Sequence, residues 1–159
     1  MPGWSFQAFQ NRSELKVAVY SWYSGQKTEI EDIYGPIGDW DVHAVTDMNR
    51  LFLTITRFNA DSSSWNASAV TDMQLMSAGA GAFNQPIGTW ETSAVTDMNG
   101  MFYLAQSFNH PIGSWNTSAV TKMASMFHLA RSFNQPIGSW HTSAVTTMKE
   151  MFRGAHSFN

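Results

Sequence analysis

Cysteine is absent from the 159-residue chain, and charged side chains are scarce. The lack of cysteine excludes disulfide bonds, thiolate metal sites and a cysteine nucleophile. Asp, Glu, Lys and Arg make up 13% of the residues, well below the usual share of about a quarter, so Ser, Thr, Asn and Gln must cover the surface. The net charge is −3 without any basic block, which argues against nucleic-acid binding.

Long apolar runs and catalytic motifs are also missing. No stretch of about 18 apolar residues occurs, so we predict no membrane span, and no N-terminal signal peptide is visible. The sequence lacks H-E-x-x-H, G-x-S-x-G and glycine-rich phosphate-loop patterns. We therefore expect a protein that is not an enzyme and that has no cofactor, catalytic residue or metal site. The histidines are scattered, at His43, His110, His128, His141 and His156.

A 25-residue pattern dominates the sequence, and its tryptophan recurs at Trp40, Trp65, Trp90, Trp115 and Trp140. A fixed period of this size is typical of arrays in which each repeat stacks on the next. We expect residues 1–32 to form an N-terminal leader and helical cap. The five predicted repeats, followed by the start of a sixth at 158–159, are 33–57, 58–82, 83–107, 108–132 and 133–157.

Two helices are predicted before the repeats. Asn11 and Glu14 fit a capping box, and apolar residues then follow at helical spacing as far as about Tyr23. A second capping box at 28–31 predicts a short helix that ends at Gly35. Because this segment does not share the repeat, we expect it to cover the open apolar end of the first coil.

Each repeat is expected to contain a turn, a short strand and a short helix. Trp115 and Thr117 would face inward and their neighbours outward, by the alternation of a strand. Apolar residues then follow at helical spacing, as at Val95, Met98, Met101, Phe102 and Ala105. The predicted fold class is an α/β solenoid, a right-handed leucine-rich-repeat-like horseshoe of about five 25-residue coils. It would have short parallel strands, short convex helices and an N-terminal helical cap.

The segment Phe-Asn-His-Pro-Ile-Gly-Ser-Trp-Asn-Thr-Ser-Ala-Val-Thr-Lys-Met-Ala-Ser-Met-Phe at 108–127 resembles a known repeat. It is similar to the BspA-type leucine-rich repeat surface proteins, also described as the DUF285 repeat, over about 33–159. This resemblance implies surface display, adhesion or protein–protein contact at the cell surface or outside the cell. Residues 58–65 depart by losing Pro-Ile-Gly, and 75–82 lack Met-Phe. The second coil is therefore either looser or carries a local binding feature.

The outward positions of the predicted strands form the main binding candidate, because solenoids bind through their concave face. The middle column varies while the frame around it repeats, and we take as candidates Asp41, His43, Asn66, Glu91, Asn116 and His141. The leading function is a non-enzymatic protein–protein interaction or adhesion module. Its partner would be a mildly basic peptide, a protein loop or a glycan. A solvated face of small residues is the alternative interpretation.

The end of the array indicates a second surface. The sequence stops two residues into a further copy without a visible capping element, which would expose Met151, Phe152 and Phe158. The alternative function is a structural subunit that docks through this end and the convex face, into a larger complex or onto a second copy.

Two polar side chains also recur at the repeat interval. Asp47, Asp72 and Asp97 are followed by Lys122 and Thr147. Stacked carboxylates about 5 Å apart repel one another unless a cation or a donor lies between them, so an interposed calcium ion is conceivable. Alternatively, each Asp bonds the backbone at a helix N-terminus. An asparagine register, expected to bond buried backbone groups and neighbouring Asn side chains, comprises Asn59, Asn84, Asn109, Asn134 and Asn159.

Overall fold

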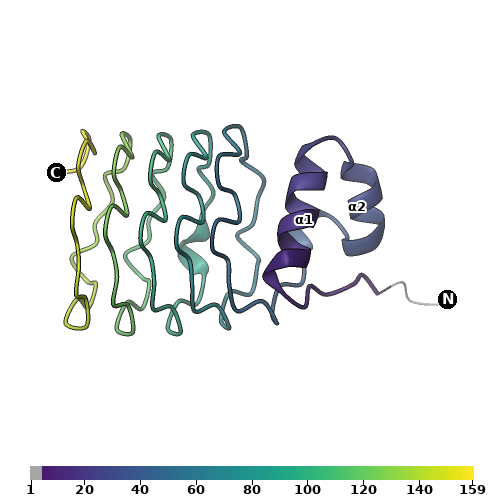
Figure 1. Ribbon diagram of the computed structural model, residues 1–159, viewed down its shortest axis with the longest axis horizontal. Coiled ribbons are helices and arrows are strands. Elements are labelled where there is room, and N and C mark those ends of the chain that lie inside the picture. The colour runs from purple at the N-terminus through teal and green to yellow at the C-terminus, as the bar shows by residue number, and fades with distance from the viewer. Residues whose placement is uncertain (1–4) are drawn as a thin grey trace.

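The computed structural model describes residues 5–159, so the first four residues of the predicted leader lie outside it. Two α-helices, α1 (Arg12–Tyr23) and α2 (Lys27–Tyr34), precede the short 3₁₀ helices η1 (Ile37–Asp39) and η2 (Ile87–Thr89). The repeats lie side by side as a row of coils, with both α-helices at the N-terminal end of that row (Figure 1).

Local sequence explains where α1 begins. Asn11 Oδ1 accepts the backbone N–H of Glu14 at 3.0 Å, and the Glu14 carboxylate accepts the N–H of Gln10 at 2.8 Å. The first bond satisfies a donor that the helix N-terminus leaves free, and the second ties the preceding residue to the first turn. The predicted helix and its Asn11 cap are confirmed, although the reciprocal bond goes to Gln10 instead of to Asn11.

The short helix α2 is also where it was predicted, but its start differs. The N-cap is Gln26, which makes no side-chain capping bond, so the predicted capping box at 28–31 is wrong. The helix ends at Gly35, whose φ of 79° is a conformation that glycine adopts at little cost. Trp22 Nε1 donates to Glu31 at 2.9 Å and thereby joins α1 to α2.

The N-terminal segment packs against the first coil. Leu15 and Val19 of α1 are fully buried in the same apolar cluster as the core of the coils. The Tyr20 hydroxyl donates to the carbonyl of Leu53 at 2.9 Å. Phe9, before the helix, is buried as well. The apolar end of the first coil is therefore covered.

The predicted α/β solenoid with parallel strands is wrong for residues 5–159. No strand forms there, and isolated parallel bridges join the coils at Asp47, Asp72, Asp97, Lys122 and Thr147. A strand ladder needs backbone donors that face the neighbouring strand. In two of the five expected strands, a threonine hydroxyl bonds to the next coil instead. Thr92 Oγ1 donates to the carbonyl of Asn116 at 3.1 Å, and Thr117 Oγ1 donates to that of His141 at 2.9 Å.

The expected convex helices do not form either, because their N–H groups bond to the next coil. Met98, Gly100, Phe102 and Leu104 donate to carbonyls of the following repeat at 2.8 to 2.9 Å. An α-helix needs these donors for bonds four residues back. Gly100 and Leu104 also have a φ of 58°, which a right-handed helix excludes. The apolar spacing instead matches turns closed between residues three apart.

Aromatic side chains fill the interior of the coils. Trp115 and Thr117 are buried, as predicted from their alternation with exposed neighbours. Phe83, Phe108 and Phe133 stack on one another with ring centroids 6.0 Å apart. Because the same ring recurs in each repeat, the apolar surface of one coil is covered by the next.

The second coil keeps its bonds to the neighbouring coils but has two defects in packing. Ser62 stands where later repeats have Ile87, and Ser77 stands where they have Phe102. Both serines are fully buried, and neither hydroxyl has a hydrogen-bond partner. The Ser77 N–H still donates to the carbonyl of Met101 at 2.9 Å. The two serine replacements therefore weaken the core of this coil, but the coil keeps its backbone bonds to its neighbours.

Candidate interaction surfaces

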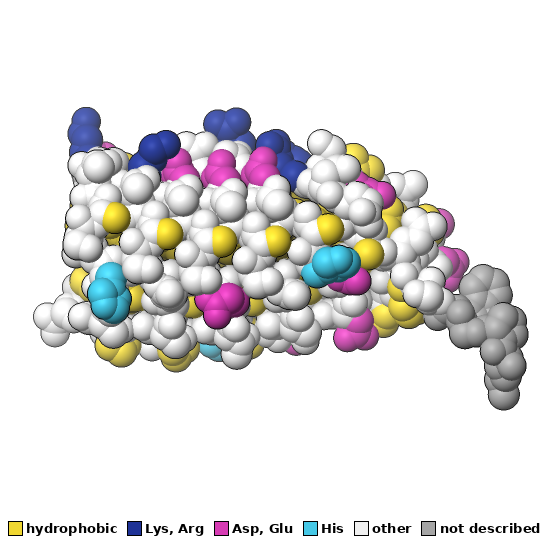
Figure 2. Space-filling model, turned by 90° about the horizontal axis from the view of Figure 1, so that it is seen from below, with side chains coloured by type: hydrophobic (Ala, Val, Ile, Leu, Met, Phe, Trp, Pro, Cys, Tyr) yellow, Lys and Arg dark blue, Asp and Glu magenta, His cyan; other side chains and the backbone are white. Residues whose placement is uncertain are grey.

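The main candidate side chains lie exposed, but on loops and not on strands of a concave sheet. We call the exposed residues Asp41, Asn66, Glu91, Asn116 and His141 the variable row. Histidine and acidic side chains are spaced along this side of the molecule (Figure 2). The predicted concave strand face is therefore wrong, although the residues assigned to it share one side of the coils.

A local hydrogen bond holds four residues of the variable row. Asp41 accepts the backbone N–H of His43 at 3.2 Å, and Asn66, Glu91 and Asn116 each accept the N–H two residues later at 3.1 Å. Such side-chain-to-backbone bonds form tight turns. The sequence interpretation missed this structural role. The sequence signal for this role is an Asp, Asn or Glu two residues before a His or Ser.

Asp41 and His43 also interact through their side chains. The His43 ring nitrogen Nδ1 lies 2.6 Å from Asp41 Oδ1. This hydrogen bond lowers the pKa of the Asp41 carboxyl below its ordinary value. The N-terminal end of the variable row therefore carries a carboxylate that is paired with an exposed imidazole. The next carboxylate of the row is Glu91.

The aspartate register is engaged by groups of the protein itself. Asp47 pairs with Arg12 at 3.3 Å, and Asp97 pairs with Lys122 at 2.9 Å, with Asp72 between them. The hydrogen bond and the charge of Asp97 raise the pKa of Lys122. Acidic side chains lie in a line with basic ones beside them (Figure 2). Across residues 5–159, no group of three or more metal-ligating side chains is found.

Each of these aspartates also accepts a backbone N–H two residues later, at 2.7 to 2.9 Å. The interpretation that they bond the backbone is confirmed. Their expected place at a helix N-terminus is wrong, because no helix begins there.

The last coil, 133–157, presents backbone donors that have no backbone acceptor within residues 5–159. In the preceding coil, Met123, Ser125, Phe127 and Leu129 donate to carbonyls of the last coil at 2.8 to 3.0 Å. The equivalent N–H groups of the last coil have no backbone acceptor within residues 5–159, and they belong to Met148, Glu150, Phe152 and Gly154. We call this surface the C-terminal edge.

Of the residues predicted to form the end surface, Phe152 and Phe158 are partly exposed. Met151 is only 6% exposed, so its predicted exposure is wrong. Phe158 also lines a groove of about 500 Å³ together with Asn159 and the turn at 134–138.

These features define a class of repeat protein, in which 25-residue coils bond to one another in a constant register. The family model described as "Mycoplasma protein of unknown function, DUF285" matches residues 18–117 and 87–159, and the chain belongs to this family. No curated protein and no solved structure matches the chain. No helix in the described part of the chain is long and apolar enough to cross a membrane.

Proposed function

We propose that the chain is a non-enzymatic protein–protein interaction module that binds through the variable row. The observation that carries the proposal is that one exposed position differs between coils while the frame beneath it repeats. Each row residue directly follows a buried tryptophan. Four of the five also bond to the backbone. Side chains that are already ordered lose less conformational entropy on binding.

The partner that suits the variable row is a mildly basic peptide, a basic protein loop or a glycan. Asp41 and Glu91 give the row two carboxylates, and no Lys or Arg belongs to it. The resemblance to BspA-type leucine-rich repeat surface proteins supports a role in adhesion at a surface.

Removing the charge without breaking the local turns tests this proposal. The double variant Asp41→Asn, Glu91→Gln keeps a side-chain oxygen for each backbone bond. On arrays of basic, neutral and acidic peptides and of glycans, we expect the wild type to bind basic peptides. The double variant should bind them at least about tenfold more weakly, which corresponds to about 1.4 kcal/mol. Asp61→Asn, an exposed site outside the row, is the matched control. Equal binding by all three proteins would contradict the proposal.

A second candidate function is a structural subunit that docks through the C-terminal edge. Its specific support is the set of four N–H groups on that edge that have no backbone acceptor within residues 5–159, because such donors are a template for pairing with another strand. Light scattering coupled to size exclusion tests self-association. We expect a dimer or larger species that Phe158→Asp converts to monomer, whereas Phe6→Asp, at an exposed phenylalanine near the other end, leaves it unchanged. A wild-type monomer would contradict docking between copies.

A further inference from the structure

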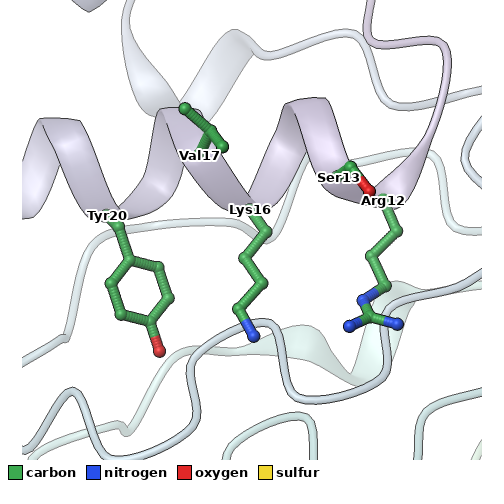
Figure 3. Close-up of a pocket in the computed structure, with 5 residues that line it drawn as sticks. All are labelled: Arg12, Ser13, Lys16, Val17 and Tyr20. Carbon is green, nitrogen blue, oxygen red and sulfur yellow. The ribbon is translucent and has the colours of Figure 1, made fainter.

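The surface of α1 carries a basic groove that neither function uses. Arg12, Lys16 and Tyr20 are spaced four residues apart, so they lie on one side of the helix. Their side chains point toward the neighbouring loops (Figure 3). Together with Ser13 and Val17 they line a groove of about 350 Å³. We call this surface the basic groove.

Positive charge gathers in the basic groove without an equal number of carboxylates. Arg12 pairs with Asp47 at 3.3 Å. Lys16 makes no ion pair with any residue of the described chain, and its nitrogen lies 5.6 Å from the Tyr20 ring centroid. Burial and the charges of Arg12 and Arg50 lower the pKa of Lys16. The two cations that line the groove, Arg12 and Lys16, therefore share one ion-pair partner, Asp47, among residues 5–159.

One polar atom at this site has no partner. The Nε of Arg12 is buried and makes no hydrogen bond, although the same guanidinium contacts Asp47 through its NH1 group. A buried donor without a partner is costly. The Arg12 side chain as a whole is 36% exposed, so an oxygen anion bound beside Arg12 and Lys16 would offset their positive charge without reaching the buried Nε.

An apolar groove adjoins the basic one on the same helix. Val17 and Ser13 line both grooves, and the second, of about 380 Å³, is also lined by Ile30, Ile33 and Tyr34. Its one carboxylate is that of Glu14, which accepts the backbone N–H of Gln10 at 2.8 Å. Val17 is 66% exposed and Ile33 is 42% exposed. Neighbouring exposed apolar side chains beside polar ones are typical of interaction sites.

We propose that α1 is the docking site for an acidic amphipathic peptide segment. Its carboxylates would contact Lys16 and Arg12, and its apolar side chains would cover Val17 and Ile33. Free phosphate would match the cations but leave the apolar groove exposed, so the adjoining grooves favour the peptide. This site deepens the proposed interaction function by adding a second surface, whose partner has the opposite charge to the partner of the variable row.

The test is an amide NMR titration of the full chain with a synthetic peptide that carries Leu at helical spacing and Glu at its other positions. We expect saturable shifts at Lys16, Val17 and Ile33 that weaken with salt, since exposed charges are screened. The matched peptide with Lys in place of Glu should cause no such shifts. The absence of saturable shifts with the acidic peptide would overturn the proposal.

Substitutions separate the two parts of the site. Lys16→Glu should weaken binding at least about tenfold, and Val17→Ser should weaken it several-fold. Lys27→Glu, at an exposed lysine of α2, should have little effect. Lys16→Gln provides a milder loss of charge if Lys16→Glu disturbs the fold. Unchanged affinity in the Lys16 variants would overturn the proposal.

Two further measurements distinguish a peptide site on α1 from a simple anion site and from the variable row. Inorganic phosphate alone should bind much more weakly than the peptide, and its affinity should be insensitive to Val17→Ser. Equal affinity for phosphate and peptide would overturn the amphipathic partner and leave only an anion site. The Asp41→Asn, Glu91→Gln variant should bind the acidic peptide normally, so failure of the variable-row proposal is distinguishable from failure of this one.

Discussion

Trp115 donates its indole N–H to the carbonyl oxygen of Ile87, 28 residues earlier, at 3.1 Å. Trp65, Trp90 and Trp140 make the equivalent bond at 2.8 to 3.0 Å. The rings of Trp115 and Trp140 also stack, with centroids 6.4 Å apart. A single side chain thus joins neighbouring coils by both packing and a buried hydrogen bond, which a leucine at this position could not do.

Replacing Trp115 by Phe keeps an aromatic ring but removes the donor to the buried carbonyl of Ile87. Because that oxygen loses its partner, we expect the free energy of unfolding to fall by about 1–3 kcal/mol in urea denaturation. Trp22→Phe is the control, since its bond to Glu31 is only part-buried, and it should cost less. Equal losses in the two variants would show that burial of the bond is not the cause.

Gly88 and Gly138 occupy the same position in different repeats but have different surroundings. A Cβ on Gly88 would collide with the carbonyl oxygen of Pro111, whereas nothing lies within 4 Å of a Cβ on Gly138. We expect Gly88→Ala to destabilise the protein by about 1–3 kcal/mol. Gly138→Ala should be neutral or stabilise it by up to about 1 kcal/mol. Chemical denaturation measures both, and equal destabilisation would point to a backbone effect instead.

Removing the hydroxyl of Ser77 should stabilise the second coil. That hydroxyl is buried without a hydrogen-bond partner, so Ser77→Ala removes a desolvated polar atom. We expect a gain of about 1 kcal/mol in the free energy of unfolding. Ser107→Ala, at an exposed serine, should change it by less than about 0.5 kcal/mol. A loss of stability in Ser77→Ala would mean that the hydroxyl is bonded in solution.

Lys122 separates the aspartate register from the uncharged Thr147. Lys122→Asp would extend the line of carboxylates, whereas Lys122→Thr only removes the cation. We expect the Asp variant to melt at a lower temperature than the Thr variant, because like charges in neighbouring coils repel. Salt should reduce the difference. Thermal melts at low and high ionic strength check this, and a difference that is independent of salt would count against repulsion.

The pairing of Asp41 with His43 predicts a pH-dependent contribution to stability. The pKa of Asp41 is lowered by this hydrogen bond, so the stabilisation is present above the unfolded pKa of about 3.9. It is lost as the pH falls through the lower pKa of the folded state. Asp41→Asn should therefore be less stable than the wild type above about pH 5, and equally stable at a pH below both values. Urea midpoints measured across this range provide the test.

A His43→Ala background supplies the control for that prediction. Without the imidazole, Asp41→Asn should produce a smaller difference, since the two residues are in direct contact. A pH-dependent difference of the same size in both backgrounds would assign it to another partner of Asp41.

The asparagine register shows which properties of a repeated polar residue the sequence alone could predict. Asn84, Asn109 and Asn134 donate their backbone N–H to Oδ1 of the asparagine one coil earlier, at 2.8 to 3.0 Å. The prediction of bonds between neighbouring asparagines and backbone is confirmed. The groups lie at the exposed surface and not in a buried turn. The 25-residue interval therefore predicted which asparagines bond to one another. Whether these bonds are buried depended on the path of the chain.

The candidate sites were predictable to different degrees. Exposure of the variable row followed from its alternation with buried residues such as Trp115 and Thr117. The sequence spacing could place Arg12, Lys16 and Tyr20 on one side of α1, but it could not show that Arg12 lies beside Asp47 of the first coil. No local pattern shows that these two residues meet.

By itself, the sequence determined the repeat interval, the two N-terminal helices and the side chains that fill the interior. Residue type and spacing are enough for these features, because burial follows apolarity and the start of α1 follows a local cap. Only the tertiary structure decided the conformation of each coil. The N–H of Gly100 donates to the carbonyl of Ala124 in the next coil, which leaves that donor unavailable to a helix. Spacing along one repeat cannot distinguish these outcomes, because the competing acceptor belongs to another repeat.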